Sequence, residues 1–147
     1  MKTTFEAVIE DLAAATGAEI RIGTDRVAEI AVGDELVLAK PTDAGEENAT
    51  IFAVVSEGEL DEAALKRALS LNLFGRGTLG GMIGLFVDSL VYSMSVRLEG
   101  LSAEDFAEKL VAFAKKATEI AADISSGSPD VVAAEADLPD LGRFMQV

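Results

Sequence analysis

Apolar residues recur at intervals of three and four in three separate segments, the spacing that places side chains on one face of a helix. The first segment predicts a helix over residues 4–16 that ends at Gly17. Its apolar face consists of Phe5, Val8, Ile9 and Leu12. The second segment predicts a helix that begins at Asp61, a good N-cap residue, and ends near Leu73.

The third helical segment is the longest and follows Ser102, which also suits an N-cap. Leu101 and Phe106 flank this cap at the spacing of a hydrophobic staple. We expect the helix to end near residue 125, before a breaker at 126–129. Its long apolar stripe predicts packing against a core and consists of Phe106, Leu110, Phe113, Ala117, Ile120 and Ile124.

Between the first two helices the pattern changes to that of strands. Residues 27–32 and 35–40 predict two strands joined by a two-residue turn, and residues 20–22 add a short extended piece before them. A polar loop is expected over residues 41–48. The strand that follows, residues 50–56, is apolar on both faces, so we expect it to be central in its sheet or covered on both sides.

Two more strands, at 82–87 and 90–98, precede the last helix and are joined by Asp88-Ser89. If these two residues form the loop, one face of the hairpin is core and the reverse is half apolar. The predicted core face carries Ile83, Leu85, Val87, Leu90, Tyr92 and Met94. The resulting order, α-β-β-β-α-β-β-α, predicts an α+β fold in which three helices pack on a curved antiparallel sheet.

The chain has 147 residues, which is the size of one domain. We expect residues 1–125 to form that domain. Residues 130–147 hold four acidic residues and one arginine. We therefore expect residues 126–147 to form an acidic, flexible C-terminal tail, with docking as a short amphipathic piece as the alternative.

Acidic residues outnumber basic ones 26 to 12, which gives a net charge of −14. This charge argues against nucleic acid or an anionic membrane as partner, because both require an excess of Lys and Arg. The chain has no Cys and no His, which excludes disulfides, thiol nucleophiles and histidine-based triads and argues against zinc sites. No apolar run is long enough to span a membrane, and acidic residues interrupt the N-terminal segment where a signal peptide would be apolar. We expect a cytoplasmic protein.

Gly75, Gly77 and Gly80 match the letters of the dinucleotide-binding pattern GxGxxG. That pattern needs a strand before it and a helix after it, so that the helix N-terminus meets the pyrophosphate. Here the predicted helix precedes the glycines and a strand follows them, so we interpret them as a flexible connection. The many carboxylates show neither a distinct catalytic pair nor the spacing of a calcium loop, and we interpret them as a solvated surface. We therefore expect no catalytic residue, no cofactor and no metal.

Two of the predicted helices leave their apolar faces open to more than one interpretation. The thin face of the helix over 4–16 is either ordinary core or a surface that leaves room for a partner segment. The helix over 61–73 is apolar on more than one side, which in so small a domain suggests burial by a second subunit. Behind the second hairpin, Met82, Phe86 and Val91 are either isolated surface residues or part of an intersubunit or ligand patch.

Residues 65–85 carry a distinctive series, and it consists of Leu69, Asn72-Leu73-Phe74-Gly75, Gly77-Thr78 and Gly84-Leu85. With this series and its order of elements, the chain resembles the Tir-chaperone (class I) family of type III secretion chaperones over residues 4–125. The closing strand at 90–98 and the long helix after it match the family as well. The sequence departs from the family where an acidic residue would follow Gly84-Leu85, although Asp88 comes soon after, and in the tail after Pro129.

The resemblance implies a homodimeric, cytoplasmic, ATP-independent chaperone that is not an enzyme. Such proteins hold the N-terminal region of a secreted effector in an extended, partly unfolded form. In the family, the first helix and the first three strands present apolar grooves and an edge to the effector, which here implies Phe5, Val8, Ile9, Leu12, Val27, Ile30, Val32 and Leu38. The second helix and neighbouring strands make the dimer, which here implies Leu65, Leu69, Asn72, Leu73, Phe74, Phe86 and Val91.

Two other classes of function stay open beside this one. The first is a regulatory or scaffold domain of the same fold that binds a folded protein partner. The second is a small enzyme that uses paired carboxylates, which a cleft with two acids of perturbed pKa would favour. Binding that needs only the isolated N-terminal segment of the partner would distinguish the chaperone from the scaffold.

Overall fold

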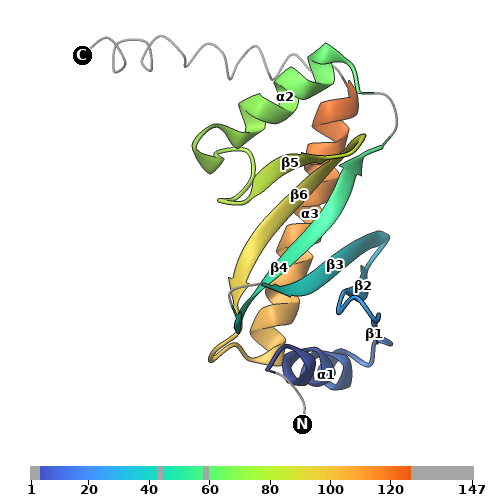
Figure 1. Ribbon diagram of the computed structural model, residues 1–147, viewed down its shortest axis with the longest axis vertical. Helices are drawn as coiled ribbons and strands as arrows, with labels where there is room; N and C mark the ends of the chain where they lie inside the picture. The colour runs from blue at the N-terminus through green and yellow to red at the C-terminus, as the bar shows by residue number, and fades with distance from the viewer. Residues whose placement is uncertain (1–3, 43–44, 58–59, 127–147) are drawn as a thin grey trace, which may run out of the picture.

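The structure, a computed structural model, describes residues 4–42, 45–57 and 60–126. Six strands form one antiparallel sheet in the order β1-β2-β3-β4-β6-β5 (Figure 1). In chain order the elements are α1 (Thr4–Thr16), β1 (Arg21–Ile22), β2 (Ala28–Val32), β3 (Glu35–Thr42), β4 (Gly45–Ser56), α2 (Glu62–Asn72), the short 3₁₀ turn η1 (Leu73–Gly75), β5 (Met82–Phe86), β6 (Ser89–Arg97) and α3 (Ala103–Ser126). This confirms the predicted α+β fold, with residues 21–22 as a strand of their own.

Helices α1 and α3 cover one face of the sheet, which we call the inner face. Figure 1 shows α3 running along the sheet behind β4 and β6, with α1 across its N-terminal end. The core lies between these layers: Tyr92 of β6 is fully buried, and its ring stacks on that of Phe113 in α3 with centroids 4.5 Å apart. Helix α2 lies at the other end of the sheet, beside β5.

Local capping signals place the helix ends where we expect them. The Asp61 carboxylate accepts a hydrogen bond of 2.7 Å from the N–H of Ala64 and so caps α2. The Ser102 hydroxyl accepts one of 3.1 Å from the N–H of Asp105 at the start of α3. These side chains satisfy N–H groups that the first helical turn leaves unpaired, so the predicted helix starts are confirmed.

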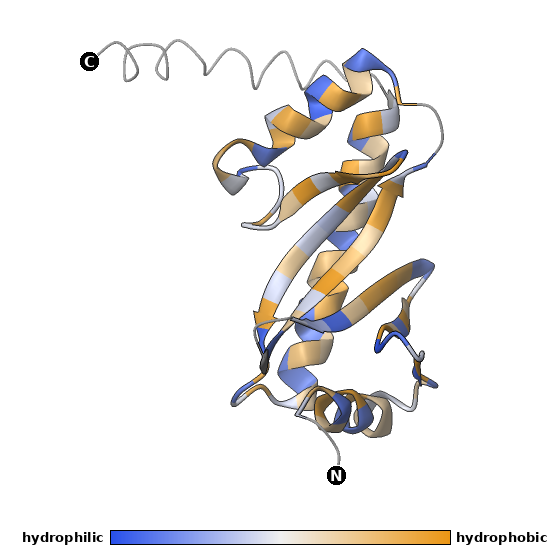
Figure 2. Ribbon diagram, in the orientation of Figure 1, coloured by the Kyte–Doolittle hydropathy of each residue, from blue (hydrophilic) through white to orange (hydrophobic). Residues whose placement is uncertain are grey.

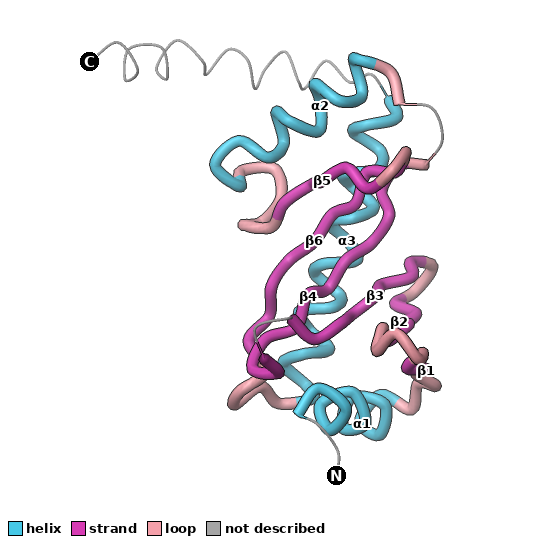
Figure 3. Tube along the Cα trace, viewed as in Figure 1, coloured by secondary structure: helices cyan, strands magenta, loops and turns pink. Residues whose placement is uncertain are grey.

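The loop predicted over residues 41–48 is wrong. Strand β3 continues to Thr42 and β4 already begins at Gly45, so most of this stretch is strand (Figure 3). Pro41 lies opposite Ala49, and Asn48 lies opposite Arg97 of β6. Ladder pairing satisfies the backbone whatever the side chains are, so a polar strand forms where its neighbours offer a partner. Hydrophobic periodicity reports burial of side chains and does not detect such a strand.

The turn of the second hairpin also differs from the prediction. Phe86 pairs with Ser89, so the two-residue turn is Val87-Asp88 and the register is shifted by two residues. A shift of two keeps every side chain on its predicted face, because the faces alternate residue by residue. Ile83 is accordingly buried, but Leu85 and Val87 lie near the turn and are 61% and 76% exposed, so their prediction as core is wrong.

Strand β4 is central in the sheet, as predicted, between β3 and β6. Its inner side is buried at Ile51, Ala53 and Val55. On the other side Phe52 is half-buried and Val54 is 41% exposed. The strand is therefore covered on one side only within the described chain. We call the sheet face that carries Phe52 and Val54 the outer face.

Two predictions concern the limits of the chain. The predicted acidic tail lies outside the described residues, apart from Ser126 at the end of α3. Within residues 4–42, 45–57 and 60–126, none of the helices combines the length and apolar character that crossing a membrane requires.

Candidate functional site

Exposed apolar side chains gather at the end of the molecule formed by α2 and β5. Of the eleven large hydrophobic side chains that are exposed in the described chain, eight lie between residues 69 and 87. We call them the α2–β5 surface, and they are Leu69, Leu73, Phe74, Leu79, Met82, Leu85, Phe86 and Val87. Figure 2 shows hydrophobic segments on both α2 and β5. Dense groups of exposed apolar side chains are typical of interaction surfaces.

Helix α2 exposes its large residues because it packs through small ones. Only Ala64 and Ala68 of this helix are buried, whereas Leu69 is 69% exposed. The Arg67 guanidinium holds the helix in place, since its Nε donates to the carbonyl of Ile124 in α3 at 3.0 Å. The helix that is apolar on more than one side thus buries its alanines, half-buries Leu65 and Leu71, and leaves Leu69 exposed.

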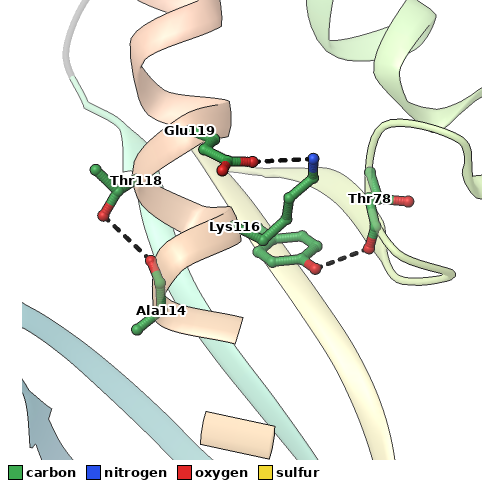
Figure 4. A network of polar contacts seen from close by, with 6 residues as sticks. Thr78, Ala114, Lys116, Thr118 and Glu119 are labelled. Carbon is green, nitrogen blue, oxygen red and sulfur yellow. Dashed lines mark hydrogen bonds and ion pairs between the residues drawn. The ribbon is translucent and has the colours of Figure 1, made fainter. Parts of the chain in front are cut away.

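The glycine-rich connection between η1 and β5 is packed and hydrogen-bonded, and is not the flexible link that we expect from sequence. A Cβ on Gly77 would lie 3.0 Å from the main chain of Leu71, and one on Gly81 would lie 2.5 Å from the carbonyl oxygen of Ser93. Thr78 is fully buried, and its carbonyl accepts a 2.7 Å hydrogen bond from the Tyr92 hydroxyl (Figure 4). Close packing therefore accounts for these glycines.

Asn72 ends α2 and is bonded to the neighbouring strand. Its Nδ2 donates to the carbonyl of Ile83 at 2.8 Å, and its Oδ1 accepts from the N–H of Ile83 at 2.7 Å. The carboxamide is thus engaged within the chain, although we predict Asn72 as an interface residue.

The other residues predicted at the dimer interface lie near or on the α2–β5 surface. Leu69, Leu73, Phe74 and Phe86 are exposed, and Leu65 and Val91 are half-buried. Sequence reasoning missed three members of the surface, which are Leu79, Leu85 and Val87, whereas Met82 was named as either an isolated surface residue or part of a patch. Leu85 and Val87 lie on the face predicted as core, and their position at the turn leaves them exposed. The apolar run over residues 82–87 covers both faces of β5 and is the signal that could have found these two.

The residues predicted to bind an effector divide into two groups. Buried in the core of the single chain are Phe5, Ile9, Leu12 and Ile30. Half-buried are Val8, Val27, Val32 and Leu38. Most of the apolar face of α1 is therefore ordinary core, which is the first of the two interpretations given for this helix. Val27 and Leu38 are brought together beside Phe52 on the outer face of the sheet.

Two grooves run along the outer face. One has a volume of about 760 Å³ at the β1–β2 end, and its lining includes Arg21, Asp25, Glu29 and Leu38. The other has a volume of about 550 Å³ toward β5, and its lining includes Lys40, Val54, Met82, Gly84, Phe86 and Val91. Val27 and Phe52 line both grooves, so the two adjoin each other. The first is mixed in polarity and the second is mostly apolar.

The sheet has two edges, and β1 covers only part of one of them. β1 pairs with Ala28 and Glu29 of β2. Along residues 30–32 no strand of the described chain lies on that side of β2. The other edge is β5.

The described residues offer little for catalysis. They contain no cluster of three or more acidic side chains that could hold a metal ion. Burial raises the pKa of Tyr92 above its ordinary value, and a hydrogen bond to Glu99 raises the pKa of Arg97. Neither shift concerns a carboxyl group, so neither gives the pair of perturbed acids that the enzyme hypothesis needs.

Comparison with known proteins gives a consistent result. The family model of the Tir chaperone protein (CesT) family matches residues 7–121. A search of the curated proteins found no match. The fold is similar to that of the type III secretion chaperone SycH from Yersinia pestis, solved in complex with a stable fragment of YscM2. That alignment has 18% identity and a TM-score of 0.59 and covers 79% of this chain and 98% of that one.

Two further solved structures share the fold. One is the ExoT–SpcS complex from Pseudomonas aeruginosa, with 19% identity and a TM-score of 0.58, covering 81% of this chain and 98% of that one. The other is YbjN from E. coli, which has been suggested to be a transcription regulator. It has 14% identity and a TM-score of 0.58, covering 82% of this chain and 90% of that one. At these identities the likeness establishes a common fold.

Proposed function

Because this chain belongs to the Tir chaperone protein (CesT) family, we propose that it is a type III secretion chaperone that binds the N-terminal region of an effector. It holds that segment extended and partly unfolded, which keeps the effector soluble and competent for secretion. Two similar structures, SycH with a fragment of YscM2 and the ExoT–SpcS complex, support this proposal. Stoichiometric binding needs no nucleophile, metal or nucleotide, so the proposed protein is no enzyme. As a secretion chaperone, it acts in the bacterial cytoplasm.

The unpaired edge of β2 is the observation that carries this proposal. The two-residue turn after Val32 makes Val32 and Glu35 a hydrogen-bonded pair, and the ladder alternates from there. The N–H and C=O of Ala31 consequently point away from β3, on the side that β1 leaves open. An extended effector segment can bond to these groups and add a strand to the sheet.

The outer-face grooves supply the side-chain contacts for such a segment. Side chains of an added strand alternate between the two faces of the sheet. Those on the outer face meet the groove lined by Val27, Leu38 and Phe52. Two of these are residues that the family resemblance implies for effector binding. Main-chain bonds give affinity in this arrangement, and the groove selects side chains.

A homodimer is the second part of the proposal. The α2–β5 surface is the densest exposed apolar area of the described chain, and a second copy of the chain would bury it. Both faces of a symmetric dimer use the same patch, so one surface suffices. The effector edge at β2 lies at the opposite end of the sheet and stays open in such a dimer.

The β2 edge can be tested with one substitution. Ala31→Pro removes the outward N–H at an exposed edge position, where proline is tolerated. We expect binding of the effector's N-terminal segment to weaken about tenfold, the usual effect of losing one well-formed hydrogen bond. The effector is first identified by mass spectrometry of what co-purifies from the native host. Its synthetic N-terminal segment is then titrated calorimetrically.

Ala31→Val is the matched control, since it changes the side chain and keeps the N–H. Wild-type affinity in Ala31→Val with loss in Ala31→Pro supports strand addition at β2. Equal affinity in both variants would place the effector elsewhere.

YbjN favours a second candidate, because it has the same fold and a suggested regulatory role. In that case the chain is a non-catalytic regulatory or scaffold domain that binds a folded protein. The same titration separates the two functions. A scaffold requires the intact, folded partner, whereas a secretion chaperone binds the isolated N-terminal segment.

A further inference from the structure

Strand β5 forms the free edge of the sheet on the side of α2. Its hairpin with β6 closes on the pair Phe86 and Ser89 around a two-residue turn. The closing pair of such a turn is hydrogen-bonded, and the ladder alternates from there. The N–H and C=O groups of Ile83 and Leu85 therefore point away from β6. They are the two outward positions at which another strand could bond to β5.

The side chains around this edge would favour such pairing. Met82, Leu85 and Phe86 are 64%, 61% and 72% exposed. An exposed apolar edge strand is a site of uncontrolled pairing between sheets, and proteins protect such edges. Among the described β5 residues there is neither a proline nor a charged side chain to do so.

Asn72 occupies the first of the two outward positions. Its carboxamide gives one donor to the Ile83 carbonyl at 2.8 Å and one acceptor to the Ile83 N–H at 2.7 Å. This is the pair of bonds that a residue of a neighbouring strand would make. A strand added along β5 would have to displace Asn72. With Asn72 in place only Leu85 keeps its main-chain groups open along β5, and an incoming strand would run into the end of α2 at Ile83.

The position of Asn72 is held from both sides. On the helix side, Arg67 fastens α2 to the carbonyl of Ile124 in α3. After the helix, the N–H of Gly77 donates to the carbonyl of Leu71 at 3.1 Å, which folds the connection back onto the helix end. The carboxamide is therefore presented to β5 by a rigid support.

We propose that Asn72 is a positioning residue that keeps the β5 edge closed to strand addition. A second copy of this chain then binds the α2–β5 surface through side-chain packing and not by joining the two sheets. Pairing with an effector strand is confined to the β1–β2 end. The statements on the dimer and the effector rest on the proposed function, whereas the closed edge concerns this chain alone.

The test replaces Asn72 by leucine, which has a similar size and makes neither bond. Size-exclusion chromatography with light scattering then gives the assembly state of the purified full chain without any effector. We expect Asn72→Leu to form assemblies larger than those of the wild type, growing with protein concentration. A double variant that adds Leu85→Pro removes one of the two outward N–H groups that Asn72→Leu leaves open, interrupts any ladder along β5 and should restore the wild-type state.

Lys66→Leu is the matched control, because it adds the same apolar side chain at an exposed position of α2 and leaves the carboxamide on Ile83. It should keep the wild-type assembly state. Larger assemblies in Lys66→Leu as well, or none in a folded Asn72→Leu, would overturn the proposal. A wild-type monomer would refute the proposed homodimer, and the comparison of the variants would still decide the edge.

Amide hydrogen exchange of the wild type gives a second measurement that does not depend on a variant that folds. The Ile83 amide should exchange at least about tenfold more slowly than the Leu85 amide, since only the first is hydrogen-bonded. Equal protection of both amides would mean that the β5 edge is paired, and would overturn the proposal.

Discussion

Thr78 is the buried polar side chain of the described core, and its environment explains the glycines around it. Its hydroxyl donates to the carbonyl of Gly81 at 2.8 Å, and its own carbonyl accepts from the Tyr92 hydroxyl at 2.7 Å. A buried polar group is tolerated when it is bonded in this way. These bonds anchor the chain that leads from α2 into β5, and so they support both the exposed apolar surface and the position of Asn72.

Tyr92 allows a test by pH. Burial raises the pKa of its hydroxyl, so the folded protein keeps the proton above pH 10.0, the ordinary value, while the unfolded chain releases it. The stabilisation that this raised pKa provides is fully present below that pH and is lost as the pH rises through the pKa of the folded protein. We expect the free energy of unfolding to fall above pH 10.0 more steeply in the wild type than in Tyr92→Phe. Urea unfolding at several pH values measures this.

Tyr92→Phe should also destabilise the protein by about 1 kcal/mol at neutral pH, because it removes one buried hydrogen bond. Tyr92 is the one tyrosine of the chain, so tyrosinate absorbance follows its ionisation directly. Identical slopes in the two proteins above pH 10.0 would contradict this account of Tyr92.

At the scale of elements, α2 and α1 show opposite uses of an apolar face. In α1, the apolar face is buried in the core of its own chain at Phe5, Ile9 and Leu12. Helix α2 packs through Ala64 and Ala68, which lets it lie close to its neighbours while Leu69 points outward. Small residues inside and large ones outside are the reverse of an ordinary surface helix, and they are what an interface helix needs.

Leu69→Asp tests the role of α2. Leu69 is 69% exposed, so the fold should keep its stability within about 0.5 kcal/mol. A charge in the middle of the α2–β5 surface should break the dimer, because a buried unpaired carboxylate is costly. Analytical ultracentrifugation gives the assembly state, and chemical unfolding of the monomer gives the stability.

Leu36→Asp is the control for this change. Leu36 is 52% exposed and lies outside the α2–β5 surface, so the same substitution there should leave the dimer intact. If Leu69→Asp remained as dimeric as Leu36→Asp, the interface would have to lie elsewhere.

At the scale of the whole molecule, the sheet separates two surfaces. The α2–β5 surface lies at one end and the open edge of β2 at the other, with α1 and α3 on the inner face between them (Figure 1). The proposed dimer surface and the proposed effector edge therefore do not overlap. The net charge of −14 favours basic effector segments and discourages non-specific association between copies of the chain.

The charge predicts a dependence on salt. The association rate of the effector segment should fall several-fold as ionic strength rises from about 0.05 to 0.5 M, because screening weakens the long-range attraction. The dissociation rate should change less, since it depends on hydrogen bonds and apolar contacts. Stopped-flow fluorescence measures both rates. An association rate that does not change with salt would show that the net charge plays no part in effector capture.

The sequence determined what depends on neighbours along the chain. The caps at Asp61 and Ser102, the helical spacing of Phe5 to Leu12 and the two hairpins are local features, and they suffice for the order of elements and the fold class. The apolar excess on α2 is also local, which is why most of the proposed interface could be named in advance.

Only the tertiary structure decided which partner each group finds. The strand at residues 45–48 exists because β6 pairs with Asn48, and the turn at Val87 follows from the register of β5 on β6. Whether an apolar face is core or surface depends on what covers it, so Phe5 went inside and Leu85 outside. The bonds from Asn72 to Ile83 join residues that become neighbours only when the connection folds back. Such pairings form between residues that are distant in sequence, and the hydrophobic periodicity along the chain therefore does not predict them.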